Sequence, residues 1–255
     1  MTSSPDPFHS PKTRLKWANE DIDSLYKQVK RFLKTAPYRQ VIDLDADGIT
    51  QILKLKFTER LPEGCTQSAT KALENLRHTL DQIGYAAAVA SGKVAPKQTY
   101  FPIGDSLVCL ENIINRNRCR DLPHQISALF LTFNPYKGGN GAIWALNKLA
   151  NAQHTTLIPD AMAAGASTSR LSVKGTGIFD MRATFDREKN EIILLRIGPG
   201  TQLQGDFSFR VLIAMGDIDC VARHEAVAVL HAMASEVQRI LLATEAECRR
   251  LRFIT

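Results

Sequence analysis

The stretch TQSATKALENLRHTLDQIGYAAAVAS, residues 66–91, decides the fold class of this 255-residue chain. Its apolar side chains recur every three or four residues, which places them on one face of an α-helix. They are Ala69, Leu73, Leu76, Leu80, Ile83 and Ala87. Thr66 or Ser68 is a suitable N-cap, and Gly92 is a typical stop after the last turn. The spacing therefore predicts one long helix with a buried face.

The same helical spacing predicts two more long helices, over 12–35 and 224–252. Ala36-Pro37 ends the first of them, because proline cannot donate to the helical ladder and restricts the residue before it. Shorter apolar segments predict helices over 106–115, 123–133 and 142–153.

Two groups of strands interrupt these helices. Residues 38–45 and 50–60 mostly alternate apolar and polar side chains, and Asp47-Gly48 between them is a strong hairpin signal. The later segments RLSVKGTGIFDMRATF, NEIILLRIG and DFSFRVLIAMG predict three or four further strands. We expect both groups to join one sheet, with the three long helices packed beside it as a bundle. The predicted class is therefore α+β, with a helical bundle core, a β-hairpin insert and a later antiparallel sheet.

A length of 255 residues fits one large domain or two small ones, and the composition, 44% hydrophobic and 23% charged, allows a sizeable core. We expect a single α+β domain over residues 13–255. The first twelve residues, MTSSPDPFHSPK, have no apolar signal core and are expected to form a flexible arm. No apolar run approaches the roughly 20 residues of a membrane span. We therefore expect a cytoplasmic protein without a membrane. Its charge of +6 is compatible with a nucleic acid partner but does not require one.

A partial calcium-loop motif is present at Asp43, Asp45 and Asp47-Gly48. A calcium-binding EF loop needs a bidentate glutamate at its twelfth position, where this chain has Lys54. The flanking residues also predict strands rather than helices. The hairpin turn accounts for the motif, and no metal site is expected; the five cysteines form no C-x-x-C pair either.

A candidate polar cluster comprises Arg77, Asp81, Asn151 and His154. Arg77 and Asp81 lie four residues apart at the border of the apolar face of the helix over 66–91. They predict either an ordinary surface ion pair or a polar pair turned inward. His154 follows a helix end, where it either caps carbonyl groups or joins a site. We expect the four side chains to converge between two central helices.

Arg118 and His124 form a second candidate pair. An arginine followed by a histidine four to seven residues later resembles the ribonuclease motif of HEPN-type helical bundles. In that family the arginine would stabilise phosphate charge and the histidine would transfer a proton. Pro123 interrupts the motif, and a solvated basic loop is the alternative interpretation.

The central third of the chain resembles a large family of uncharacterised bacterial proteins. The shared pattern runs from Leu76-Arg77, Leu80-Asp81 and Tyr85 through Phe101-Pro102-Ile103 and Pro135-Tyr136 to Trp144, Leu146, Leu149 and His154. It spans about residues 69–157. Where the family has Asp and Arg around its histidine, this chain has Ala152 and Thr155. The resemblance implies a helical core with an inserted sheet and supplies no substrate.

Two functional hypotheses follow. The chain has no Gly-rich phosphate loop and no G-x-S-x-G motif, and no cofactor is expected. The first hypothesis is a soluble, non-enzymatic binding or interaction protein of unknown partner. The second is a HEPN-like enzyme that cleaves nucleic acid through Arg118 and His124. Whether the protein is an enzyme stays open at this point.

Overall fold

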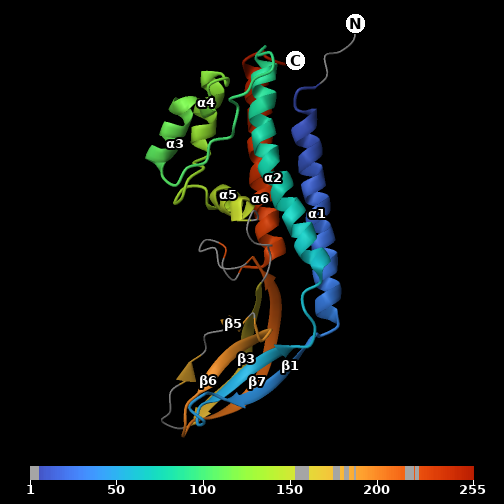
Figure 1. Ribbon diagram of the computed structural model, residues 1–255, viewed down its shortest axis with the longest axis vertical. Helices are drawn as coiled ribbons and strands as arrows, with labels where there is room; N and C mark the ends of the chain where they lie inside the picture. The colour runs from blue at the N-terminus through green and yellow to red at the C-terminus, as the bar shows by residue number, and fades with distance from the viewer. Residues whose placement is uncertain are drawn as a thin grey trace.

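The computed structural model describes residues 6–255 except 153–160, 175–178, 181–183, 187, 216–220 and 222–223. Three long helices run side by side along the long axis of the molecule (Figure 1). They are α1 (His9–Lys34), α2 (Glu63–Ala90) and α6 (Ala226–Arg250), and each packs on the other two. Each presents a buried stripe to its neighbours, on α2 the one that the sequence predicts. The predicted three-helix bundle is confirmed.

Two helix starts differ from the sequence predictions. Helix α2 begins at Glu63 without a side-chain cap, so Thr66 and Ser68 lie inside it, and Ser68 accepts a hydrogen bond from Gln28 of α1 at 3.0 Å. Helix α1 begins at His9, so the predicted flexible arm over 1–12 is too long. The reason is Phe8, which is fully buried and anchors the start of the helix.

Three shorter helices lie on the side of α2 and α6 that faces away from α1, where α5 packs on both long helices and α4 packs on α6 (Figure 1). They are α3 (Leu107–Ile113), α4 (His124–Thr132) and α5 (Gly141–Ala152), and each matches a predicted helix. A π-helical turn, Ile114–Arg118, follows α3.

The hairpin β1 (Tyr38–Leu44) and β2 (Gln51–Phe57) joins later strands in one antiparallel sheet, as predicted. Its order is β1-β2-β6-β4, with β6 (Glu191–Ile197), β4 (Phe179–Asp180) and β5 (Thr184–Asp186), which also pairs with β6. Two long strands, β3 (Ala161–Lys174) and β7 (Gln202–Ala214), pair with each other in a separate two-stranded sheet, so the expectation of a single sheet is wrong for these two strands. The α+β class is confirmed.

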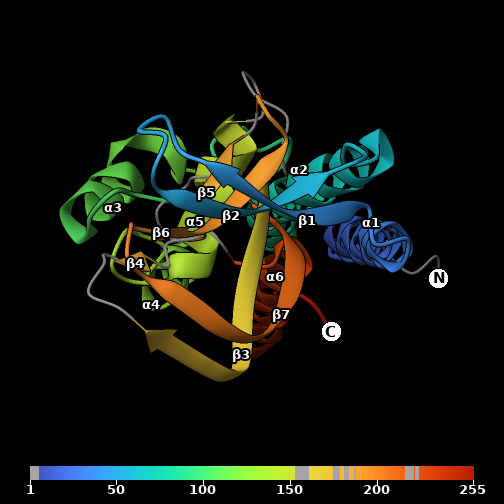
Figure 2. The same cartoon turned by 90° about the horizontal axis from the view of Figure 1, so that it is seen from below.

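The sheet stands across one end of the bundle rather than beside it, so the expected side-by-side packing is wrong (Figures 1 and 2). The chain passes from α1 into β1 and from β2 back into α2 at this end, so the hairpin continues the helices lengthwise. Apolar side chains of the sheet, including Leu53, Leu55 and Ile192, nevertheless belong to one buried cluster with the helices.

Helix α6 is long and apolar enough to span a membrane by length and composition alone, with a mean hydropathy of 1.3 over its most apolar window. The core helix of a soluble protein meets the same criterion. Here Leu230, Val237 and Ile240 are buried against the other helices of the bundle.

Candidate functional site

A cleft of about 850 Å³ lies between the loop that joins α4 to α5 and the middle of α6. The loop is residues 134–140, NPYKGGN, and the facing part of α6 is residues 232–239. Side chains that can bind or stack on a ligand line it: Phe133, Asn134, Tyr136, Asn140, Ser235, Glu236 and Arg239.

The loop holds its shape through its own backbone. The carbonyl oxygen of Asn134 accepts the N–H groups of Tyr136 and Asn140, each at 2.7 Å. Asn134 and Gly138 have positive φ angles of 51° and 90°, which asparagine and glycine tolerate best. At Gly139 a Cβ atom would collide with the Asn134 carbonyl. Glycine is therefore required there for the loop to close on itself.

Asn140 joins the loop to both helices. Its Oδ1 accepts the N–H of Ile143 at 3.1 Å and so caps the first turn of α5. Its Nδ2 donates to Oε2 of Glu236 on α6 at 2.8 Å. One side chain thus fixes the loop, the start of α5 and the wall of the cleft relative to one another.

Glu236 and Arg239 form the charged wall of the cleft. Oε2 of Glu236 accepts from Nη2 of Arg239 at 2.8 Å and from Nε at 3.2 Å. Chiefly because Arg239 donates to it, the pKa of Glu236 lies below its ordinary value. The Arg239 guanidinium also lies 4.9 Å from the centre of the Phe133 ring, a cation–π contact. The carboxylate is therefore held ionised and the guanidinium is oriented.

Sequence reasoning missed these two residues. In the sequence, Glu236 and Arg239 form one of several oppositely charged pairs spaced i,i+3 or i,i+4 along α6. Glu247 and Arg250 form another, so spacing alone does not single out the pair in the cleft. The available signal was the loop NPYKGGNG, which the sequence identifies as turn-rich without indicating which helix it faces.

The predicted polar cluster is brought together in part. Arg77 donates to Asp81 at 2.9 Å and, through Nε, to Asn147 of α5 at 3.3 Å. Asn151 is exposed one turn further along α5. His154 lies outside the described residues, so the expected contact with it stays a prediction.

Asp81 binds the segment around Phe101 in addition to Arg77. The same Oδ1 accepts the backbone N–H of Phe101 at 3.2 Å. Phe101 is buried, and its ring centre lies 4.8 Å from that of Phe130 in α4. Arg77 and Asp81 are therefore turned inward. Through Asp81, the pair holds the segment that contains Phe101 against α2.

The alternative nuclease pair lies on the surface. Arg118 ends the π-helical turn, and His124 is the first residue of α4; both are exposed. No hydrogen bond or ion pair joins their side chains in the part of the chain that the structure describes. Asp121 between them accepts the N–H groups of Lys97 and Gln98 at 2.8 and 2.9 Å, which fixes the intervening turn.

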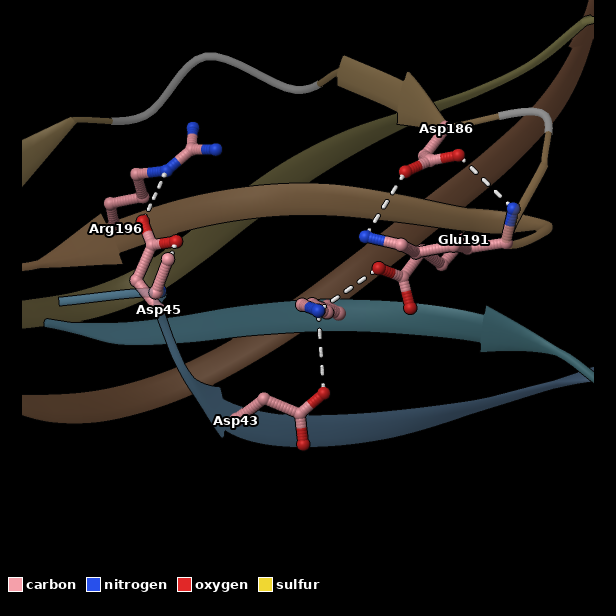
Figure 3. Close-up of polar contacts among 8 residues, drawn as sticks. Asp43, Asp45, Asp186, Glu191 and Arg196 are labelled. Atoms are coloured by element: carbon pink, nitrogen blue, oxygen red, sulfur yellow. Dashed lines mark hydrogen bonds and ion pairs between the residues drawn. The ribbon is translucent and has the colours of Figure 1, made fainter. Parts of the chain in front are cut away.

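The three aspartates of the partial calcium motif have separate protein partners. A carboxylate oxygen of Asp43 lies 3.3 Å from Nζ of Lys54, and one of Asp45 lies 3.3 Å from Nε of Arg196 (Figure 3). Asp47 accepts the N–H groups of Ile49 and Thr50 and shapes the hairpin turn. Among the described residues no three His, Cys, Asp or Glu side chains are grouped so as to hold a metal ion.

Comparisons with protein-family models, with curated proteins and with solved structures find no match to this chain. The geometry of the cleft therefore carries the functional argument.

Proposed function

We propose that this is a binding protein that takes a small polar molecule in the cleft between the α4–α5 loop and α6. The observation that carries the proposal is the cleft itself, because its volume of about 850 Å³ lies within the usual range of small-molecule sites. Aromatic side chains and several polar groups line that volume, and the polar share is larger than in most small-molecule sites, which favours a polar ligand.

The charges of the wall indicate the kind of ligand. Glu236 and Arg239 neutralise each other, so the wall has no excess of one sign. Among the described residues, no hydrogen bond engages Oε1 of Glu236 or Nη1 of Arg239. The charged wall thus keeps one acceptor atom and one donor atom for a ligand. This combination fits a neutral or zwitterionic molecule that carries both donors and acceptors, rather than a polyanion.

The proposal contains no catalytic step. The lowered pKa of Glu236 favours a carboxylate that accepts hydrogen bonds over an acid that gives up a proton. The HEPN-like nuclease remains a separate prediction, because it depends on Arg118 and His124 and on no residue of the cleft.

A thermal-shift screen with neutral and zwitterionic polar compounds tests the proposal. We expect some compounds to raise the melting temperature of the parent protein. Replacing Arg239→Gln should weaken their binding about ten-fold or more, because a hydrogen bond to a charged group contributes about 1.5–3 kcal/mol. Replacing Ala232→Trp should abolish binding by filling the cleft, which Ala232 lines.

Arg250→Gln is the matched control. Arg250 forms the same i,i+3 pair with Glu247 on the same helix, outside the cleft. Ligands should bind this variant as they bind the parent. Compounds that bind Arg239→Gln and Ala232→Trp as tightly as the parent would overturn the proposal, and so would a screen that yields no ligand.

A further inference from the structure

Strand β1 is the outermost strand of its sheet, and β2 is its one partner among the described strands. Asp45 donates its backbone N–H to the carbonyl of Thr50, and Thr58 donates its N–H to the carbonyl of Pro37. These two bonds set the phase of the ladder, so the odd-numbered residues from 37 to 45 direct their backbone groups toward β2. The alternating pattern of an antiparallel ladder then directs the backbone groups of Gln40, Ile42 and Leu44 away from β2. This edge can accept another strand.

Two large apolar side chains of β1 are open to solvent. Ile42 and Leu44 are 60% and 61% exposed. Natural sheets usually blunt an exposed edge with prolines, bulges or charged side chains, and of these β1 has only the charges of Arg39 and Asp43. The pairing of β1 with β2 is regular, and the strand contains no proline.

Two charged side chains of β1 have incomplete partners. Arg39 is exposed and lies directly opposite Lys56 of β2, a like charge. Like charges in this position destabilise a sheet. Asp43 contacts Lys54 through one oxygen, and its side chain is 49% exposed. Figure 3 shows the other oxygen of Asp43 on the side away from Lys54. The strand therefore carries one cation and one anion that can each take a further partner.

We propose that β1 pairs with β1 of a second copy of this chain, antiparallel and centred on Val41. A two-fold axis at Val41 sets Arg39 of each copy opposite Asp43 of the other. It also sets Gln40 opposite Ile42 and Tyr38 opposite Leu44. The strand YRQVIDL is thus complementary to itself in charge, and the exposed Ile42 and Leu44 gain neighbours.

The backbone agrees with this register. Gln40 and Ile42 both direct their free N–H and C=O groups to the open edge, so they form a hydrogen-bonded pair across the axis. Arg39 and Asp43 then form a non-hydrogen-bonded pair, in which side chains approach more closely. A single added strand buries an area at the small end of specific interfaces, so the dimer should depend on concentration. No residue of the cleft takes part.

Sedimentation velocity over a wide concentration range tests the pairing. The parent should shift from monomer to dimer as its concentration rises. Arg39→Asp and Asp43→Arg should each dimerise about ten-fold or more weakly, because like charges then meet across the axis. An equimolar mixture of these two variants should restore the dimer, because every cross-axis pair in that heterodimer joins opposite charges.

Two further variants keep the test decisive if Asp43→Arg weakens the fold. Ile42→Pro removes one N–H from the open edge and none from the pairing with β2, so it should block the dimer. In a background with Cys109→Ser and Cys220→Ser, Val41→Cys should cross-link to itself under mild oxidation, whereas Gln40→Cys should not. A parent that stays monomeric throughout, or cross-linking that is equal at both positions, overturns the proposal.

Discussion

Arg77 donates a hydrogen bond to Asp81 at 2.9 Å, one turn further along α2, and the same carboxylate oxygen accepts the backbone N–H of Phe101. The side chains of Arg77 and Asp81 are only 20% and 30% exposed. The pair therefore differs from a free surface ion pair, because it joins α2 to Phe101, which follows Asp81 by twenty residues. Removal of the pair should therefore lower the free energy of unfolding.

Replacing Asp81→Ala should lower the free energy of unfolding by about 1–3 kcal/mol, since it leaves the Phe101 N–H without its acceptor. Urea denaturation at neutral pH measures the change. Glu20→Ala is the control, because Glu20 and Lys16 form an exposed i,i+4 pair of the same spacing on α1. That change should stay within about 0.5 kcal/mol. Equal losses in the two variants would contradict the role given to Asp81.

Gly84 provides a second prediction for the same segment. A Cβ atom at Gly84 would collide with the carbonyl oxygen of Thr99. The segment that contains Thr99 can therefore pack this closely on α2 only because residue 84 has no side chain. Gly84→Ala should destabilise the protein by about 1–3 kcal/mol, in spite of the better helix propensity of alanine. Differential scanning calorimetry measures the effect. In the control Gly64→Ala, the new methyl meets only the flexible side chain of Gln28, and the change should be smaller.

The periodicity of residues 66–91 was sufficient to predict α2, because the apolar stripe that forms the pattern is also the surface that α1 and α6 bury. The hairpin was predictable for a similarly local reason, since Asp47-Gly48 sets the turn and alternation sets the strands. Local spacing cannot report where elements meet. It therefore gave no reason to place the sheet across the end of the bundle (Figure 1).

The inward orientation of Arg77 and Asp81 was only partly predictable from the sequence. Their position at the border of the stripe left two interpretations open, and only the position of Phe101 decides between them. The cleft was beyond that limit. Glu236 follows Asn140 by 96 residues, and their contact depends on how α6 packs against the α4–α5 loop.

The cleft predicts a contrast between two neighbouring glycines. Gly139→Ala should weaken ligand binding and loosen the loop, because the new methyl collides with the Asn134 carbonyl. Gly141 also lines the cleft, but a Cβ atom there meets nothing within 4 Å and leaves the loop closed, so Gly141→Ala should weaken binding less than Gly139→Ala does. Isothermal titration with a ligand from the screen compares the two. Unchanged binding in Gly139→Ala would show that the closed loop is not needed for the site.

Lys54 predicts a dependence of stability on pH. Its side chain is 13% exposed and lies 2.9 Å from Glu191, which is 5% exposed. The pKa of Lys54 is raised above 10.5, chiefly because Lys54 donates a hydrogen bond to Glu191. The stabilisation is therefore complete below about pH 10.5 and disappears as the pH rises through the higher folded value. Lys54→Met should cost about 3–5 kcal/mol at neutral pH, because Glu191 loses its cation in the interior.

The alkaline range separates this effect from a loss of packing. The difference in unfolding free energy between the parent and Lys54→Met should shrink as the pH rises from about 10.5 through the higher folded pKa of Lys54, because the folded parent loses the charge over that range. The double variant Lys54→Met with Glu191→Gln should recover part of the loss at neutral pH, because no buried charge is then left unpaired. A difference that stays constant with pH would contradict the electrostatic explanation.

The nuclease alternative makes the last prediction. Tyr100 donates its N–H to the Arg118 carbonyl at 3.1 Å, and Asp121 holds the N–H groups of Lys97 and Gln98, so the turn that carries Arg118 and His124 is fixed in place. If the turn cleaves RNA, His124→Ala should lower the rate about 100-fold or more, the usual contribution of a general acid or base. A fluorogenic RNA substrate measures this. His231→Ala, an exposed histidine on α6, should leave the rate unchanged. Cleavage that survives in His124→Ala, or a parent that cleaves nothing, would leave the binding function as the better account.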